Sequence, residues 1–308
     1  MIERETAVDT AMGPLSGVIA IPDGKPGSGL VLVDGSGPAT RDAWGAMPRW
    51  FAEQGVATLR HDKPGCGGSP GDWRQQRFSD RAAEALAAAA TLRAESGATA
   101  VGLIGYSQGG WIALLAAATE PRSVDFVVTI SGPGVGVAEQ ERVRIERALR
   151  RAGFDEDAVD DALDWVDERA ARLAIGEEPS RVLADQTAHA AEPWYGLAID
   201  GPYSTAEELA FAARALTFDP ATVVPHVRCP ILACFGAADD LVPVERSVAV
   251  LAERLPALHR GANGLVVFPG ADHMLYVEEP RPGVDRISQL APGFLPVLAD
   301  FLARRQLF

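Results

Sequence analysis

Residues 101–110, with the sequence VGLIGYSQGG, constrain the fold more than any other stretch of the chain. An apolar, strand-like run ends at residue 104, the motif Gly-Tyr-Ser-Gln-Gly occupies residues 105–109, and an alanine-rich, helix-forming segment follows. The two glycines permit a turn that is too tight for side chains at their positions. A strand, a tight turn and a helix, with Ser107 at the apex of the turn, is the arrangement that presents a serine as a nucleophile.

The pattern Gly-x-Ser-x-Gly occurs a second time, at residues 67–71, and the residue after each serine separates the two matches. A serine nucleophile of this kind uses the backbone N–H of the next residue to stabilise an oxyanion. Gln108 follows Ser107 and has this N–H group, whereas Pro70 follows Ser69 and has none. We therefore interpret residues 67–71 as a turn.

Composition limits the class of protein. The chain has 308 residues, 47% of them hydrophobic, which is enough for one large domain or one domain with an insertion. The net charge is −14 and the lysines and arginines are not clustered, which argues against nucleic acid and membrane surfaces as partners.

The N-terminus and the cysteines indicate a compartment. The first residues are charged and no apolar segment follows, so we expect neither a secretory signal nor a transmembrane helix. The three cysteines, Cys66, Cys229 and Cys234, have no C-x-x-C spacing, so we expect no disulfide framework and no zinc site. We expect buried thiols in a reducing cytoplasm.

Strand-like and helix-like segments alternate along most of the chain. After a predicted hairpin at residues 6–21, apolar strand-like runs lie at residues 30–33, 56–60, 99–104, 125–130, 230–235 and 264–268. Helices are predicted at residues 41–54, 78–95, from residue 111 onward, 244–258 and 292–305. This alternation predicts an α/β fold with a mostly parallel central sheet flanked by helices, and it places functional loops at the carboxyl ends of the strands.

The alternation stops at residues 135–224, where no strand-like run occurs. We predict a helical cap there, inserted into a core domain formed by residues 1–134 and 225–308, with helices at residues 139–151, 155–174, 180–191 and 205–216. Trp194, Tyr195 and Tyr203 either line a substrate pocket or form the core of the cap, and both interpretations remain open. For Trp165 and Phe211 we favour packing.

An activated serine needs a base, and the base needs an acid that orients it. Of the five histidines, only His273 follows the last predicted strand within a loop. Asp239 follows the preceding strand and is the preferred acid over its neighbour Asp240, which we expect to cap a turn. Asp272 is too near His273 in sequence to orient it easily. The triad predicted in this way has the order Ser, Asp, His.

An oxyanion hole needs two backbone donors. The first is the N–H of Gln108, and for the second we choose Ser36, with Gly37 as the reserve, in the glycine-rich segment after the strand at residues 30–33. The alternative is an ordinary turn before a helix capped by Asp42. The glycine-rich segment that begins at His61 is interpreted as a turn fixed by Pro64.

Four sets of residues together resemble the α/β-hydrolase superfamily over essentially the whole chain. They are the segment from Gly35 to Asp42, the segment from Asp62 to Ser69, the motif around Ser107, and Gly236, Asp239, Val242 and Pro243 with Gly270 and His273. Within it, the chain is most similar to bacterial serine esterases and peptidases of the esterase D and dienelactone-hydrolase-like group. Such proteins often carry a histidine where this chain has Asp34, and an ionised carboxylate there would oppose an oxyanion.

The resemblance implies acyl transfer in two steps, with Ser107 as nucleophile, His273 as base and Asp239 as orienting acid. It implies no metal or organic cofactor. We expect a carboxylic ester hydrolase acting on small-molecule acyl esters. An acyl-amino-acid or peptide hydrolase, a thioesterase, and a non-hydrolytic binding protein or cyclase remain alternatives. The oligomeric state is open, with a homodimer as one option.

Overall fold

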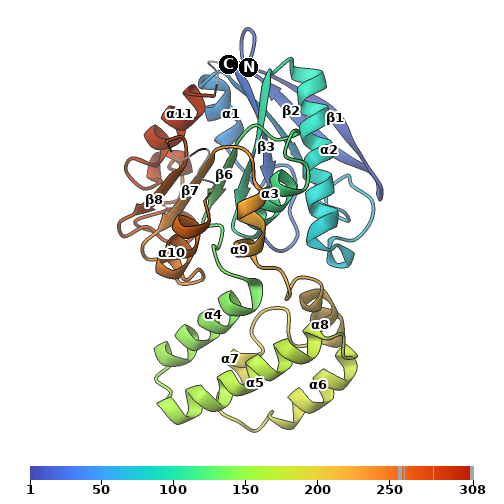
Figure 1. Ribbon diagram of the computed structural model, residues 1–308, viewed down its shortest axis with the longest axis vertical. Coiled ribbons are helices and arrows are strands. Elements are labelled where there is room, and N and C mark those ends of the chain that lie inside the picture. Colours follow the sequence, from blue (N-terminus) through green and yellow to red (C-terminus); the bar gives the residue numbers. More distant parts are fainter. Residues whose placement is uncertain (256–258, 260, 280, 306–308) are drawn as a thin grey trace.

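One sheet of eight strands forms the centre of the computed structural model, which describes residues 1–255, 259, 261–279 and 281–305 (Figure 1). The strand order is β1-β2-β4-β3-β5-β6-β7-β8. The strands are β1 (Ile2–Thr10), β2 (Gly13–Ile21), β3 (Ser28–Val33), β4 (Val56–His61), β5 (Ala100–Tyr106), β6 (Val127–Ile130), β7 (Ile231–Gly236) and β8 (Gly264–Phe268). Strand β2 is antiparallel to both of its neighbours, β1 and β4, and the other pairs of neighbouring strands are parallel.

Helices cover both faces of the sheet (Figure 1). The flanking helices are α1 (Met47–Glu53), α2 (Phe78–Ser96), α3 (Gln108–Thr119), α10 (Val244–Arg254) and α11 (Phe294–Ala303). In β3, Val31 and Val33 pack with α2 and α3 on one face, while Leu30 and Leu32 pack with α1 and α11 on the other. Alternate residues of a strand point to opposite faces, so a strand covered on both sides reads as a continuous apolar run. The predicted fold class is confirmed.

Some element boundaries differ from the predictions for local reasons. The helix predicted at residues 41–54 begins only at Met47, because Gly45 has a φ of 53° and Pro48 occupies the first helical turn. The helix after the serine begins at Gln108, earlier than predicted, because it follows the turn directly. Residues 256–258, at the end of the helix predicted at 244–258, lie outside the described residues.

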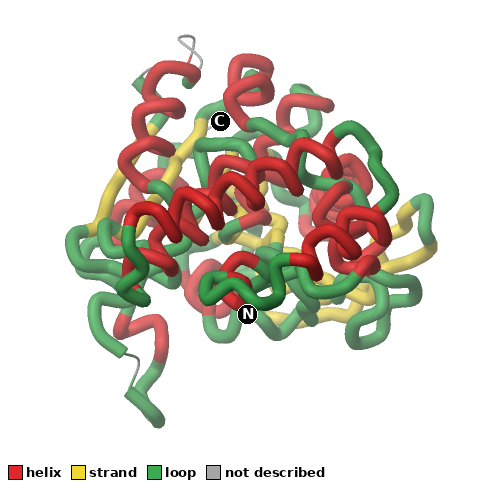
Figure 2. Tube along the Cα trace, turned by 90° about the horizontal axis from the view of Figure 1, so that it is seen from below, coloured by secondary structure: helices red, strands yellow, loops and turns green. Residues whose placement is uncertain are grey.

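A set of helices with its own hydrophobic cluster lies between β6 and β7. It contains α4 (Val137–Arg151), α5 (Glu156–Ala174), α6 (Pro179–Ala188), α7 (Tyr195–Ala198) and α8 (Ala206–Ala213), and α9 (Pro220–Val223) and a 3-10 helix at Val224–His226 lead back to β7. We call residues 135–224 the helical insertion. Figure 1 shows α4 to α8 beyond one end of the sheet, and Figure 2, seen from that end, shows helices across the front of the molecule. The division into two domains stays a prediction that this separate cluster favours.

None of the described helices combines the length and the apolar character that crossing a membrane requires.

Candidate active site

Ser107 sits in a backbone conformation that the turn forces on it. Its φ is 51° and its ψ is −123°, in the left-handed region that non-glycine residues rarely adopt. A Cβ on Gly105 would lie 2.0 Å from the carbonyl oxygen of Gly109, and a Cβ on Gly109 would lie 2.2 Å from that of Val33. The Ser107 N–H donates to the Ile130 carbonyl at 2.8 Å. The turn is therefore held rigidly against the ends of β3 and β6.

Asp239 and His273 form a hydrogen-bonded pair at the ends of β7 and β8. Nδ1 of His273 lies 2.7 Å from Oδ2 of Asp239, whose side chain is fully buried. The other carboxylate oxygen accepts the N–H groups of Leu241 at 2.8 Å and Val242 at 2.9 Å. These bonds fix the carboxylate, and the carboxylate fixes one edge of the imidazole and leaves the other edge free.

The neighbouring acids have other partners. Asp240 forms an ion pair at 3.0 Å with Arg151 of α4. Asp272 accepts two N–H groups of its own turn, from Met274 and Tyr276, each at 2.8 Å. Neither carboxylate is therefore placed as Asp239 is.

The other histidines lie elsewhere. The ring of His189 packs between two tryptophans of the helical insertion, and Nε2 of His259 lies 2.7 Å from the carbonyl oxygen of Arg228. His226 ends the 3-10 helix before β7, and Nδ1 of His61 lies 3.3 Å from the carbonyl oxygen of Asp62. Of the five histidines, His273 is the one that lines a cavity with Ser107.

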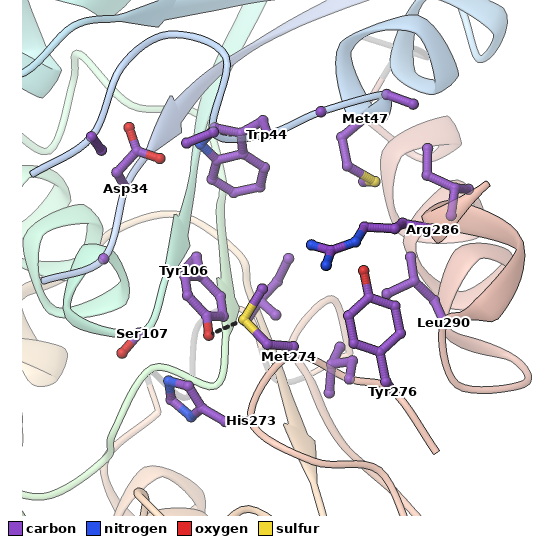
Figure 3. Close-up of a pocket in the computed structure, with 18 of the residues that line it drawn as sticks. Asp34, Trp44, Met47, Tyr106, Ser107, His273, Met274, Tyr276, Arg286 and Leu290 are labelled. Carbon is purple, nitrogen blue, oxygen red and sulfur yellow. Dashed lines mark hydrogen bonds between the residues drawn. The ribbon is translucent and has the colours of Figure 1, made fainter. Parts of the chain in front are cut away.

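Ser107 and His273 both line a cavity of about 670 Å³. Figure 3 shows Ser107 and His273 at the same end of this cavity. Asp34, Gly35 and Ser36, from the loop after β3, line the same end. The structure thus brings the predicted nucleophile, base and oxyanion segment to one place, with the predicted acid directly behind the base.

Two buried basic groups, Lys63 and Arg81, hold the loop after β3, and burial lowers the pKa of Lys63 to about 6. Lys63 Nζ donates to the carbonyls of Gly35 at 2.5 Å and Gly37 at 2.7 Å. Arg81 of α2 donates to the Asp34 carbonyl at 2.6 Å and to the side-chain oxygen of Gln108 at 2.5 Å. Because Lys63 and Arg81 donate hydrogen bonds to these carbonyls and to Gln108, they hold the loop and the first turn of α3 in place beside Ser107. Lys63 lies in the segment that was interpreted as a turn fixed by Pro64, and neither Lys63 nor Arg81 was predicted to lie at the site.

The donors expected for an oxyanion are available. Gln108 is the first residue of α3, so its N–H has no acceptor within the helix. Ser36 N–H has no hydrogen-bond acceptor among the described residues. Burial raises the pKa of the Asp34 carboxyl, and the charges of Lys63 and Arg81 partly offset that effect. The raised pKa, about 6, increases the fraction of neutral acid as the pH falls toward that value, and the neutral acid does not repel an oxyanion.

The aromatic residues predicted to bind substrate lie away from this cavity. Trp194 and Tyr203 are buried in the hydrophobic cluster of the helical insertion, and Tyr195 packs against that cluster. The cavity is lined by loops of the α/β core, and its described lining includes no residue of the insertion. The apolar and aromatic lining residues are Trp44, Met47, Tyr106, Ile130, Met274, Leu275, Tyr276, Ile287, Leu290 and Phe294. The feature of the sequence that could have identified them is their position, because all but Phe294 lie in or beside loops at the carboxyl ends of strands.

No group of three or more His, Cys, Asp or Glu side chains within the described ranges is arranged to hold a metal ion.

Comparison with known proteins gives one family. The model of the alpha/beta hydrolase family matches residues 26–286. A pimeloyl-[acyl-carrier protein] methyl ester esterase of Aeromonas salmonicida is 28% identical over 185 residues, which are 59% of this chain and 67% of that protein.

Two solved structures illustrate the likeness in fold. The alpha/beta hydrolase GrgF of Penicillium sp. sh18 has a TM-score of 0.63 at 20% identity, with all of both chains covered. A dienelactone hydrolase of Anabaena variabilis has a TM-score of 0.50 at 20% identity, covering 98% of this chain and 95% of that one. At these identities the structures show a shared fold.

Proposed function

The chain belongs to the alpha/beta hydrolase family, and we propose that it is a serine hydrolase that cleaves carboxylic esters through an acyl-enzyme intermediate. The observation that carries the proposal is the 2.7 Å contact between Asp239 and His273, with Ser107 and His273 lining the same cavity (Figure 3). A nucleophile, a base and a fixed acid in this order are the parts that acyl transfer requires.

In the proposed first step, Nε2 of His273 takes the proton of the Ser107 hydroxyl while its oxygen attacks the ester carbonyl. Asp239 holds the imidazole in the tautomer that leaves Nε2 free and stabilises the cation that forms. The N–H groups of Gln108 and Ser36 donate to the oxyanion. His273 then protonates the leaving alcohol, and a water molecule activated by His273 releases the acid.

The choice of an ester over other acyl substrates is supported by the relative named as a methyl ester esterase and by the mainly apolar lining of the cavity. Amides and thioesters are cleaved by the same chemical steps. The test therefore has to compare the three bond types directly.

The experiment labels the protein with a fluorophosphonate and reads the intact mass of the wild type, Ser107→Ala and the control Ser180→Ala, a surface serine of α6. We expect the adduct in the wild type and the control and none in Ser107→Ala. Turnover of p-nitrophenyl esters, aminoacyl anilides and acyl thioesters then ranks the bond types, with esters expected first. A folded wild type that takes no label would refute the serine mechanism, and faster anilide turnover would refute the ester assignment.

A further inference from the structure

The cavity has a second polar end, formed by Tyr276 and Arg286 in the segment after β8. Figure 3 shows the Arg286 guanidinium reaching into the cavity toward the Tyr276 hydroxyl, across from Ser107 and His273. Arg286 is the first residue of the 3-10 helix at Arg286–Gln289. The inference that follows concerns this end of the cavity and rests on the proposed function.

Both groups are hydrogen-bond donors without an acceptor in the described part of the chain. Tyr276 is only 7% exposed, yet its hydroxyl makes no hydrogen bond there. Arg286 forms no ion pair or side-chain hydrogen bond with any described residue. Its neighbour Asp285 uses one carboxylate oxygen to accept the N–H of Ile287 at 3.1 Å. Because both residues line the cavity, their donor groups are available to a ligand in it.

Apolar side chains of the cavity lie beside these two donors, and Arg286 itself is exposed to solvent. Met47, Met274 and Leu290 lie around them in Figure 3. The acidic residues that line the cavity, Asp34 and Asp42, form no ion pair with Arg286. Burial raises the pKa of Tyr276 and the charge of Arg286 lowers it, so the phenol keeps its proton near neutral pH and remains a donor. A cation and a phenol facing one apolar space can satisfy both oxygens of a carboxylate.

We propose that Tyr276 and Arg286 bind a carboxylate carried by the substrate, so that the preferred esters bear an acid group at the far end of an apolar chain. The chain would occupy the cavity between Ser107 and Arg286, and its acid group would receive hydrogen bonds from the guanidinium and the phenol. Arg286 and Tyr276 then determine specificity and take no part in bond cleavage. The acid group can belong to the acyl part or to the alcohol part of the ester, and the experiment has one arm for each.

In the first arm, kcat/KM is measured for p-nitrophenyl monoesters of linear dicarboxylic acids of rising length and for p-nitrophenyl alkanoates of matched length. In the second arm, butyrate esters of ω-hydroxy acids are compared with butyrate esters of plain alcohols by titration of the released acid. We expect one arm to show a preference of about tenfold or more for the carboxylate at an optimal length, the size that charge-assisted hydrogen bonds give.

Three variants test which residues cause the preference for a carboxylate. Arg286→Gln should lower the ratio of kcat/KM for carboxylate-bearing esters to kcat/KM for uncharged esters by about tenfold, because only the carboxylate accepts hydrogen bonds from the guanidinium. Tyr276→Phe should remove a smaller part. The control Arg281→Gln changes an exposed arginine of the same segment that does not line the cavity, and it should behave as the wild type. Unchanged melting temperatures would show that all three variants fold.

The outcomes separate this inference from the proposed function. Hydrolysis of uncharged esters with no carboxylate preference in either arm would overturn the inference and leave the serine hydrolase intact. If no ester is hydrolysed, calorimetry on Ser107→Ala with monomethyl esters of dicarboxylic acids still decides the matter. Binding that is lost in the double variant with Arg286→Gln supports the carboxylate site, and equal or absent binding in both refutes it.

Discussion

The proposed role of Asp239 as the orienting acid depends on which of its atoms face the backbone and which face His273. One oxygen accepts two backbone N–H groups and the other faces Nδ1 of His273. In Asp239→Asn, the oxygen of the amide can keep the backbone bonds, so the NH₂ group faces Nδ1 and places the proton on Nε2. The imidazole can then no longer accept the proton of Ser107. We expect kcat to fall by about four orders of magnitude.

The matched control for that prediction is Asp272→Asn, one residue before the base. The Asp272 carboxylate accepts only the N–H groups of its own turn, and we expect a loss of activity of less than about tenfold. Steady-state kinetics with one p-nitrophenyl ester measures both variants. Similar losses in the two would contradict the assignment of Asp239 as the orienting acid.

Glu84 gives a residue-scale prediction about pH. Burial raises its pKa from 4.5 to about 7, and Arg81 and Gln76 offset only part of the effect. The folded protein therefore holds this proton more tightly than the unfolded chain. The stability contributed by this group is present below pH 4.5 and is lost as the pH rises toward 7, by at most about 1.4 kcal/mol per unit.

Glu84→Gln, which does not titrate, removes this loss. We expect the free energy of unfolding of the variant to rise relative to that of the wild type between pH 5 and pH 7.5. Urea denaturation at the two pH values measures the difference. A difference that is the same at both values would argue against a shifted pKa at Glu84.

At the scale of elements, the loop after β3 is positioned by Lys63 rather than by its own residues. Its carbonyls at Gly35 and Gly37 accept from Lys63 Nζ, which orients the peptide units around Ser36. In Lys63→Met these bonds are lost and the Ser36 N–H is less well aimed at the oxyanion. We expect kcat to fall by about tenfold to a hundredfold with a smaller change in KM, because the N–H acts mainly in the transition state.

The exposed Lys25 provides the control, since Lys25→Met removes the same side-chain type and Lys25 precedes the opposite end of β3 from the loop. A change in KM alone for Lys63→Met would show that the lysine supports substrate binding and not the oxyanion donors. Circular dichroism melting curves separate both results from a loss of folding.

At the same scale, features that depend on a local pattern were predictable from the sequence, and features that depend on distant contacts were not. The strands and the Ser107 turn were predictable because each depends on a local pattern, an apolar run or two glycines. His273 and Asp239 were predictable because each follows a strand. Lys63 and Arg81 were missed because their acceptors are backbone carbonyls of a distant loop, which no spacing along the chain reveals.

The binding cavity was not predicted for a related reason. From the sequence, the aromatic residues of the helical insertion could either line a pocket or form the core of the insertion, and Trp194 and Tyr203 are core residues. The residues that do line the cavity come from the loop after β3 and from the segment after β8, which have no periodic pattern. The two segments come together because the carboxyl ends of the parallel strands β3 and β8 lie at the same edge of the sheet, although the two strands are not neighbours in it.

At the scale of the whole molecule, the helical insertion is connected to the loop that carries Asp239. Arg147 of α4 donates to the carbonyls of Asp239 at 3.2 Å, Asp240 at 3.4 Å and Val242 at 3.0 Å. We expect Arg147→Gln to loosen the loop after β7 and to lower kcat/KM by about threefold to tenfold through a less well fixed Asp239.

Hydrogen exchange of the loop after β7 measures this coupling. The control is Arg142→Gln on the same helix, because Arg142 pairs with Asp167 and Glu146 inside the insertion. Faster exchange at residues 239–242 in both variants, or in neither, would show that Arg147 does not connect the insertion to the site.

The hydrogen bond from the Val137 N–H to the Phe218 carbonyl, 3.1 Å long, closes the helical insertion at its base. From the side of the sheet, the whole insertion is therefore equivalent to one short loop between β6 and β7. Replacing this stretch by another would leave the strand order and every described residue that lines the cavity unchanged. Selection on the insertion and selection on the cavity can then proceed separately, with Arg147 as a contact that an exchanged segment would have to restore.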